Sequence, residues 1–332
     1  MDLWAERVEV FRYAAPGRPL STLKPWRLED LATIRRVLAS GYDATARALS
    51  VAPTAHILAL WALPSGHWAR RASASNGIPY SVWTLGSDIW ALGKIPLVKG
   101  YLRRVLRDAQ YCFSDGIGLA EDTRAIGARP VEFLPSSRRI GSRRLSPVRK
   151  SPPYRLLYLG RWHPNKGTDL LVEALQGLDD AAWERIESVD IQGGGPLEVA
   201  LRHEVASLRG QGRPVRLGGF LPKEAAEAAI LDADYLLIPS RIESIPVVLS
   251  DALKLRCPVI CTPVGDLPGI VSKHQVGVIA AGVDARAIRD AIREAVLGER
   301  QIDERALDEA AEVFDMERIA SRITCLAGSV QA

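Results

Sequence analysis

Short apolar runs alternate with amphipathic segments along almost the whole chain. A run of four to eight apolar residues predicts a buried strand, and apolar residues that recur every three or four positions predict a helix. On this basis we expect strands at 7–12, 55–60, 79–84, 110–114, 131–134, 155–160, 189–192, 215–217, 235–238 and 257–261. Helices are expected at 28–38 (ended by Gly41), 68–74, 97–107, after a cap at Asp115, and at 168–175, 197–208, 246–255, 284–296, 304–313 and 316–327. This alternation is typical of an α/β fold in which helices cover both faces of parallel sheets.

Residues 136–153 interrupt the alternation. The segment is rich in Ser, Pro and Arg and shows no apolar period. We interpret it as a solvated basic linker between domains, although its basic residues could also bind phosphates. A chain of 332 residues is long enough for two domains. We therefore predict an N-terminal domain at 1–135 and a C-terminal domain at 154–314.

Charge is unevenly spread between the two halves. Residues 1–150 carry 23 basic and 12 acidic side chains, a net of +11, and residues 151–332 carry 20 and 27, a net of −7. The basic half is therefore expected to meet an anionic membrane surface or a phosphorylated acceptor. No nucleic-acid motif accompanies the charge, so that partner ranks last. The sequence has no apolar run long enough for a membrane span, no visible signal peptide and no paired cysteine spacing, which predicts a cytoplasmic location.

Two acids lie eight residues apart after the apolar run 235–238. Pro246 begins the predicted helix, Glu243 lies in the preceding turn, and Asp251 lies within the helix. Ligands of open parallel sheets bind where strands end and helices begin, and helix amino ends favour phosphate. Eight helical residues span about 12 Å, so the two acids could contact two parts of one extended ligand. A buried loop acid beside a solvated helix acid explains the spacing equally well.

A second candidate loop follows the predicted strand 155–160. Gly160 lets the backbone turn closely, and Arg161 and Lys166 supply two cations that suit a diphosphate. Taken alone, such a loop is more often plain surface. The glycine turn at 193–195 lacks the full dinucleotide fingerprint and is explained as well by a tight turn between strand and helix.

Four motifs in order resemble the C-terminal domain of family 4 glycosyltransferases, which are retaining enzymes of the GT-B fold. They are Gly160-Arg161…Lys166-Gly167, Gly193-Gly194-Gly195-Pro196, Gly218-Gly219-Phe220, and Pro239-Ser240…Glu243…Pro246…Asp251-Ala252. The resemblance implies two Rossmann-like domains that face a cleft. It also implies that a final helix within 315–332 packs back on the N-terminal domain.

The resemblance further implies roles for the motif residues. The donor diphosphate would be held by Gly160, Arg161, Lys166 and the backbone N–H groups of Ser244 and Ile245. Glu243 would contact the donor sugar, Asp251 would accept hydrogen bonds from the ribose hydroxyls, and the loop at Gly219 and Phe220 would border the base. No metal or cofactor is expected, because basic side chains and helix dipoles would stabilise the leaving diphosphate.

The first half resembles the acceptor domain of the family more loosely. Residues 79–88 align with a strand that often ends in His-Gly-x-Asp. Asp88 is present and is a second catalytic candidate, whereas Leu85 replaces the histidine. Ser244 stands for the usual glycine and Asp251 for the usual glutamate. The family's opening strand and glycine-rich loop do not precede 7–12, which suggests a start upstream or an incomplete acceptor site.

We therefore expect a metal-independent, hexosyltransferase-like enzyme. It would transfer a sugar from a nucleotide diphosphate sugar to a glycan or lipid-linked glycan with retention of configuration. It would work in the cytoplasm, with peripheral contact to an anionic membrane. The alternative is a non-catalytic or degenerate GT-B subunit that binds a nucleotide sugar or a partner enzyme. A GT-B epimerase is a third option, but its catalytic acids and histidines are not apparent in the sequence.

Overall fold

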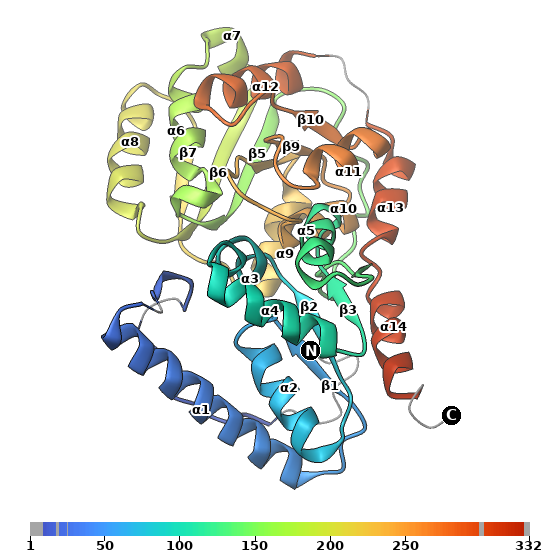
Figure 1. Cartoon of the computed structure of the whole chain (residues 1–332). Helices are drawn as coiled ribbons and strands as arrows, with labels where there is room; N and C mark the ends of the chain where they lie inside the picture. The colour runs from blue at the N-terminus through green and yellow to red at the C-terminus, as the bar shows by residue number, and fades with distance from the viewer. Residues whose placement is uncertain (1–8, 18–19, 25, 299–301, 329–332) are drawn as a thin grey trace. The chain divides into compact units, whose positions relative to one another are not determined.

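The computed structural model describes residues 9–17, 20–24, 26–298 and 302–328. The chain forms two compact units, one of residues 1–135 with 317–332 and the other of residues 136–316 (Figure 1). Both units hold a parallel sheet, so the predicted α/β fold with two parallel sheets is confirmed. No helix among the described residues is long and apolar enough to cross a bilayer.

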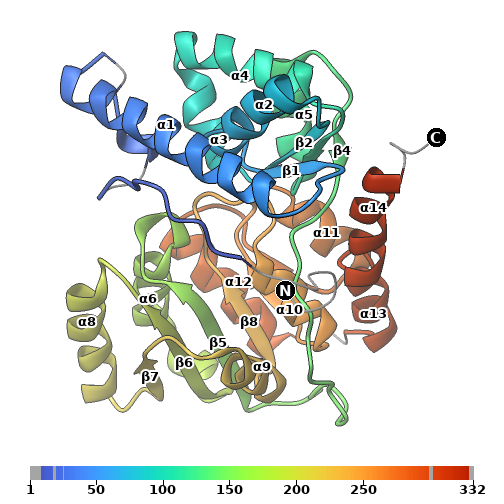
Figure 2. The ribbon, with the colours of Figure 1, turned by 90° about the horizontal axis from the view of Figure 1, so that it is seen from below.

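The first unit is built on a four-stranded parallel sheet in the order β1 (Ile57–Leu60), β2 (Tyr80–Thr84), β3 (Cys112–Ser114) and β4 (Glu132–Phe133). Successive residues of a strand face opposite sides, so Val82 and Trp83 enter two different cores. The core that contains Val82 also takes side chains of the connecting helices α2 (Ser65–Asn76), α4 (Pro96–Asp108) and α5 (Ile117–Gly127). The core that contains Trp83 takes Ile319 from α14 (Met316–Gly328), which lies against this sheet (Figure 2).

Three expectations for the first unit differ from the structure. Of the strand expected at 7–12, residues 7 and 8 lie outside the described residues, and 9–12 form no strand. Asp115 is buried, and the N-cap residue of α5 is Gly116, one position later than expected. Helix α1 (Leu28–Val51) continues through Gly41 instead of ending there. A Cβ at Gly41 would lie 2.1 Å from two ring carbons of Trp68, so this glycine provides space for a ring rather than a helix end.

Gly41→Ala is expected to destabilise the protein by about 2 kcal/mol, because the added methyl group overlaps the Trp68 ring and forces α1 and α2 apart. Gly100→Ala in α4 is the matched control, since a Cβ there meets no heavy atom within 4 Å. Alanine is favoured over glycine inside a helix by about 1 kcal/mol, so the control should be as stable as the wild type or more stable. Urea unfolding measures both, and equal stability of the two variants would contradict the packing role of Gly41.

The second unit holds a six-stranded parallel sheet in the order β10-β9-β8-β5-β6-β7. The strands are β5 (Tyr154–Arg161), β6 (Ile186–Gly194), β7 (Val215–Gly218), β8 (Tyr235–Ile238), β9 (Val259–Cys261) and β10 (Gly277–Ile279). Strand β10 was not predicted, since we expected only helices after 261. Strands β6 and β7 are added on one side of β5, and β8, β9 and β10 are then added on its other side. The strand order therefore reverses between β5 and β8.

Helices cover both faces of this sheet. Helix α6 (Thr168–Gln176) packs against α8 (Glu198–Gly210) and α12 (Ala285–Leu297), and α10 (Val247–Lys254) packs against α9 (Lys223–Asp232) and α13 (Glu304–Glu312) (Figure 1). The remaining helical segments are η3 (Pro164–Lys166), α7 (Asp180–Trp183) and α11 (Leu267–His274). The apolar run 235–238 forms β8, and the run 257–261 ends in β9; both are inner strands with helices on both sides, which explains why the runs are uninterrupted.

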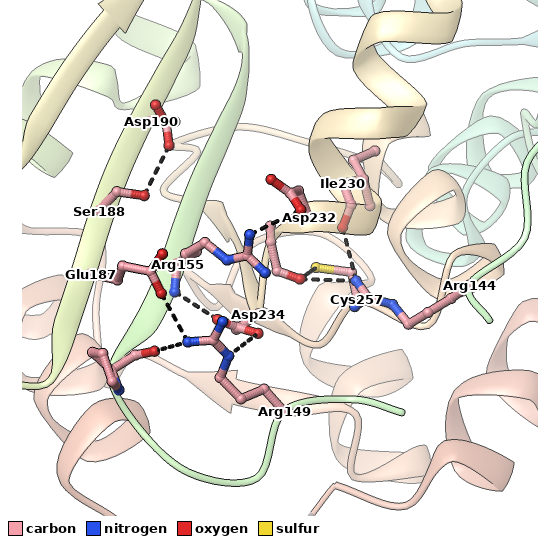
Figure 3. Close-up of polar contacts among 12 residues, drawn as sticks. Arg144, Arg149, Arg155, Glu187, Ser188, Asp190, Ile230, Asp232, Asp234 and Cys257 are labelled. Carbon is pink, nitrogen blue, oxygen red and sulfur yellow. Dashed lines mark hydrogen bonds and ion pairs between the residues drawn. The ribbon is translucent and has the colours of Figure 1, made fainter. Parts of the chain in front are cut away.

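Two arginines of the segment 136–153 are not solvated as we expected. Arg144 is only 8% exposed, and its guanidinium donates to the carbonyl oxygens of Leu255, Ile230 and Ala233 at 2.9–3.0 Å. Arg149 forms ion pairs with Glu187 and Asp234 (Figure 3). These contacts fasten the segment across the second unit. Its composition resembled that of a linker because arginines can serve as buried donors as well as surface charges.

Candidate donor-sugar site at the carboxyl ends of β5 and β8

The point where the strand order reverses lies between β5 and β8. Open α/β sheets bind their ligands just beyond the carboxyl ends of the strands at such a point. Arg161 is the last residue of β5, and Pro239 follows the last residue of β8. The two loops that carry most of the predicted site residues therefore begin next to each other.

These two loops are fastened together by contacts that demand particular residues. Gly167 has φ 67°, and a Cβ there would lie 1.8 Å from the Pro239 carbonyl oxygen, so only glycine allows this approach. The Arg241 backbone N–H donates to the Asn165 carbonyl at 2.8 Å. The Arg241 guanidinium also binds both carboxylate oxygens of Asp169, at 2.8 and 2.7 Å. The geometry of one loop is therefore set by the other.

Lys166 and Glu243, predicted from separate motifs, form an ion pair in the structure. The Lys166 Nζ donates to Glu243 Oε1, which also accepts a hydrogen bond from Ser240 Oγ at 3.0 Å. The Glu243 side chain is 11% exposed and the Lys166 side chain 28% exposed. The loop closure described above thus places one cation and one carboxylate together, with the cation more open to solvent.

A pocket of about 190 Å³ lies at the ends of β5 and β6, and β5 is also the strand that leads into the loop of Lys166. It brings together Gly160, Phe220 and Asp251, which the sequence placed in three separate motifs. The other side chains and backbone groups that line it belong to Arg138, Leu159, Gln192, Gly193, Leu221, Ala226 and Val248. One wall is therefore charged, and most of the remaining wall is apolar or backbone, which suits a flat ring attached to polar groups.

The charged wall of the pocket is the ion pair of Arg138 and Asp251. The Arg138 Nε lies 2.9 and 2.8 Å from the two carboxylate oxygens, and a terminal nitrogen lies 2.7 Å from Oδ2. Burial raises the pKa of Asp251 above its usual value, although the hydrogen bonds from Arg138 oppose this effect. The carboxylate is therefore not the solvated helix acid of the alternative interpretation. A carboxylate has about four lone-pair sites, so Asp251 can accept further hydrogen bonds from the pocket side.

The other predicted donor residues lie around these two features. The Arg161 side chain is exposed, and its carbonyl oxygen accepts a hydrogen bond from the Tyr158 hydroxyl at 2.9 Å. Phe220 is 68% exposed and covers Gly194, and the Gly219 carbonyl accepts from the Gly193 N–H at 3.1 Å. Ser244 and Ile245 are buried where the loop turns into α10. Their side chains therefore hold the loop in place.

Asp88 lies in the first unit, in a position that does not suit a group that contacts a substrate. Its side chain is buried, and its carboxylate accepts hydrogen bonds from the backbone N–H groups of Ala62 at 2.7 Å and Leu85 at 3.3 Å. The short helix α3 (Ser87–Trp90) begins at this point. In this geometry Asp88 fixes the loop after β2, and Leu85 packs with Trp83 and Phe113. The prediction of a catalytic Asp88 therefore has no support from its surroundings.

The Asp88 carboxyl should make stability depend on pH. Burial raises its pKa from 3.8 to about 6, so the folded protein binds this proton more tightly than the unfolded chain. The contribution of this group to the free energy of unfolding is fully present below about pH 4. It is lost as the pH rises through about 6, and the total loss is up to about 3 kcal/mol. Relative to the wild type, Asp88→Asn should gain stability across this range. Urea unfolding at pH 4.5 to 7.5 measures the effect, and Asp43→Asn at an exposed acid of α1 serves as control. Parallel curves for wild type and Asp88→Asn would contradict it.

Two pocket residues were missed by the sequence analysis. Arg138 is one of four arginines at 138–144, and nothing in their spacing shows which one pairs with Asp251. Gln192 lies near the end of β6, and its side chain lies over Gly218, where a Cβ would be 2.0 Å from the Gln192 Oε1. Among the described residues, no cluster of three His, Cys, Asp or Glu side chains could hold a metal ion. The expectation of a metal-independent site stays a prediction.

Comparison with known proteins identifies the family. The profile of the family described as "Glycosyl transferases group 1" matches residues 144–313, and the chain belongs to that family. It is 29% identical over 251 residues to the putative teichuronic acid biosynthesis glycosyltransferase TuaC of Bacillus subtilis. That match covers 71% of this chain and 60% of TuaC, so the chain spans less than two thirds of this relative.

Solved structures show the same two-domain fold. The sucrose-phosphate synthase of Thermosynechococcus elongatus superposes with a TM-score of 0.69 at 17% identity, over 93% of this chain and 82% of that one. Anabaena HepE in complex with UDP-glucose superposes with a TM-score of 0.67 at 16% identity, over 94% of this chain and 84% of that one. At these identities the likeness establishes the fold, and the predicted GT-B architecture is confirmed.

Proposed function

We propose that this chain is a retaining glycosyltransferase that takes a sugar from a nucleotide diphosphate sugar. One observation carries the proposal. At the point where the strand order of the second sheet reverses, a cation–carboxylate pair joins the loops after β5 and β8, and a pocket with a charged wall opens at the ends of β5 and β6. A nucleotide sugar has matching parts in the same order, namely a sugar, a diphosphate, a ribose and a base. Family membership supports the same ligand class, as does the fold shared with HepE, which was solved in complex with UDP-glucose.

Each part of the donor has a proposed partner. The base and ribose occupy the pocket, with the base beside Phe220 and Gly219 and the ribose hydroxyls donating to Asp251. The diphosphate lies over Gly160, where Arg161 and Lys166 and the backbone N–H groups of Ser244 and Ile245 meet it. The sugar extends toward Glu243. Lys166 then contacts both the diphosphate and the Glu243 carboxylate, and the ion pair fixes the positions of Lys166 and Glu243 relative to each other.

The proposed reaction proceeds on one face of the sugar. The acceptor oxygen attacks the anomeric carbon from the side on which the bond to the diphosphate breaks, so the configuration is retained. The leaving phosphate oxygen takes the acceptor proton, and the nucleoside diphosphate departs as an anion. Lys166, Arg161 and the amino end of α10 stabilise this developing charge without a metal ion.

The proposed acceptor is a glycan or a lipid-linked glycan, and the proposed setting is the cytoplasm with peripheral contact to an anionic membrane. The net charge of +11 on residues 1–150 supports this contact. TuaC is named for teichuronic acid biosynthesis, which fits a polysaccharide acceptor.

A second candidate function is a non-catalytic subunit that binds a nucleotide sugar or supports a partner enzyme. Leu85, which packs in a core where a histidine would be expected, favours it. The buried Asp88 favours it as well, because neither residue offers a reactive group in the first unit.

Incubation with a panel of nucleotide sugars separates the two functions. With a suitable lipid-linked or soluble glycan acceptor, the enzyme should release nucleoside diphosphate and form a product whose anomeric configuration equals that of the donor, as read by NMR. Nucleotide binding without release of nucleoside diphosphate from any donor would favour the non-catalytic subunit. Inverted product would refute the retaining mechanism.

A further inference from the structure

The first unit contains an apolar cavity that the donor site does not use. Its volume is about 260 Å³, and it lies among η1 (Leu20–Thr22), α1, the loop at 63–64, η2 (Leu92–Lys94) and α4. Its walls include Leu23, Val37, Leu63, Leu97 and Val98. An apolar cavity of about 150 Å³ stays dry and binds benzene in a well-studied protein. A cavity of the present size can therefore hold a longer piece of hydrocarbon.

The side chains that line the cavity offer a ligand almost no polar partner. Tyr101 is the one lining residue with a polar side-chain atom, and its hydroxyl is already hydrogen-bonded to His67 Nδ1 at 2.5 Å. All other lining residues are Leu, Ile, Val or Pro. A sugar or phosphate inside would lose its hydrogen bonds to water without replacement. The part of a ligand that enters is therefore hydrocarbon.

The segments that line the cavity also expose apolar side chains to solvent. Leu97 lines the cavity and is 86% exposed, which places the cavity in contact with the surface of the unit. Trp26 and Leu28, at the start of α1, are 67% and 85% exposed. Three large exposed apolar side chains on segments that also line an apolar cavity are suited to contact with a membrane or an amphiphile.

The same segments also carry positive charge. The lining segments 20–38 and 92–101 carry six basic residues, which are Lys24, Arg27, Arg35, Arg36, Lys94 and Lys99. All six side chains are exposed. The same segments hold two acids, Glu29 and Asp30, and the Asp30 carboxylate accepts the backbone N–H of Lys24 at 2.8 Å. The charge therefore complements an anionic headgroup.

From the apolar cavity and the cations on its lining segments, we infer that the first unit binds an anionic lipid at the membrane surface. Its hydrocarbon chain enters the cavity, and its headgroup meets the exposed lysines. A single buried chain gives only weak and reversible membrane attachment, and stable attachment needs a second signal such as a basic patch. This unit supplies both signals from the same two segments, 20–38 and 92–101. Identifying that lipid as the acceptor rests on the proposed function, but the binding itself does not.

Vesicle co-sedimentation of the full chain tests the inference. The protein should sediment with vesicles that contain phosphatidylglycerol and stay in solution with pure phosphatidylcholine. Leu97→Glu, which places a carboxylate on the cavity wall, and the double variant Lys94→Glu/Lys99→Glu should each weaken binding at least tenfold. Each basic residue near an anionic surface changes membrane affinity about fivefold. All three substituted residues are exposed, so the fold should tolerate the changes.

Two matched controls lie on the second unit. Val199→Glu changes an apolar side chain that is 84% exposed, and Lys273→Glu reverses an exposed lysine. Neither should alter sedimentation. If Leu97→Glu sediments as well as Val199→Glu while the double lysine variant fails, binding is surface electrostatics only and the cavity assignment is wrong. Sedimentation that does not depend on phosphatidylglycerol would overturn the inference altogether.

Calorimetry with soluble probes separates the chain from the headgroup. Dodecyl phosphate should bind, inorganic phosphate should not, and dodecyl maltoside should bind at least tenfold more weakly than dodecyl phosphate. Equal affinity for the two dodecyl compounds would show that the lysines do not bind the headgroup. Binding of inorganic phosphate but not of dodecyl phosphate would show that the cavity does not bind the hydrocarbon chain. Leu97→Glu should bind nucleotide sugars like the wild type, so failure of this inference is distinguishable from failure of the donor site.

Discussion

Lys166→Ala is expected to lower donor turnover by a factor of about 10²–10³ or more while the protein stays folded. The lysine Nζ is the cation that the structure holds at the junction of the β5 and β8 loops, bound to Glu243. Removal of one preorganised donor to a developing oxyanion typically has an effect of this size. Loss of the lysine also leaves the Glu243 carboxylate, which is 11% exposed, with the Ser240 hydroxyl as its remaining side-chain partner.

Glu243→Ala should reduce turnover to a similar extent by a different route. Lys166 remains to meet the diphosphate, but the sugar loses its contact and the lysine loses the carboxylate that orients it. Nucleotide affinity should therefore fall more in Lys166→Ala than in Glu243→Ala. Release of nucleoside diphosphate and thermal unfolding, measured on the same preparations, separate catalysis from stability. Lys223→Ala, at an exposed lysine at the start of α9, is the control and should leave turnover unchanged. Full activity of either Lys166→Ala or Glu243→Ala would contradict the assignment of these residues to the donor site.

Arg144→Ala should have the largest effect on stability, with a loss of about 3–5 kcal/mol in the free energy of unfolding. The buried guanidinium donates to three carbonyl oxygens, from Leu255, Ile230 and Ala233. These carbonyls end α9 and α10, where helices leave acceptors unsatisfied. Removing the side chain leaves them buried without this partner (Figure 3).

The neighbouring arginine provides the control for this prediction. Arg143 is exposed, and Arg143→Ala should unfold at the same urea concentration as the wild type. The two variants therefore compare a buried hydrogen-bond donor with an exposed charge at two adjacent arginines. If the two variants are equally stable, the segment 136–153 is the solvated linker that its sequence suggested, and its contacts with the second unit contribute little.

The sequence predicted the strand–helix alternation of the fold well because apolar periodicity records burial directly. Its errors arose where one residue type serves two purposes. Gly41 could end a helix or make room for a ring, and only the position of Trp68, 27 residues later, decides between them. The arginines at 138–144 could be solvated or could donate to buried oxygens, and periodicity does not distinguish these uses. Strand β10 is three residues long and too short for a periodic signal.

The residues of the candidate site could be predicted from sequence motifs, but the contacts between them could not. Glu243 and Lys166 were each identified from a loop, and their ion pair depends on Gly167 packing against Pro239, a contact across 72 residues of sequence. The partner of Asp251 was missed because Arg138 precedes the domain core by a segment without a regular pattern. The role given to Asp88 came from an alignment with a family motif, and its buried contacts with the backbone of Ala62 and Leu85 do not favour that role.

We propose that the second unit binds the diphosphate of a nucleotide sugar at Lys166 and its ribose at Asp251. Calorimetric titration of wild type, Lys166→Ala and Asp251→Asn with nucleosides, nucleoside diphosphates and nucleotide sugars measures both contacts. One site per chain should bind a diphosphate more tightly than its nucleoside, and Lys166→Ala should lose most of that difference. Asp251→Asn should weaken ribonucleotides more than their 2′,3′-dideoxy forms. Absence of nucleotide binding to the wild type, or equal diphosphate affinity in wild type and Lys166→Ala, would contradict the claim.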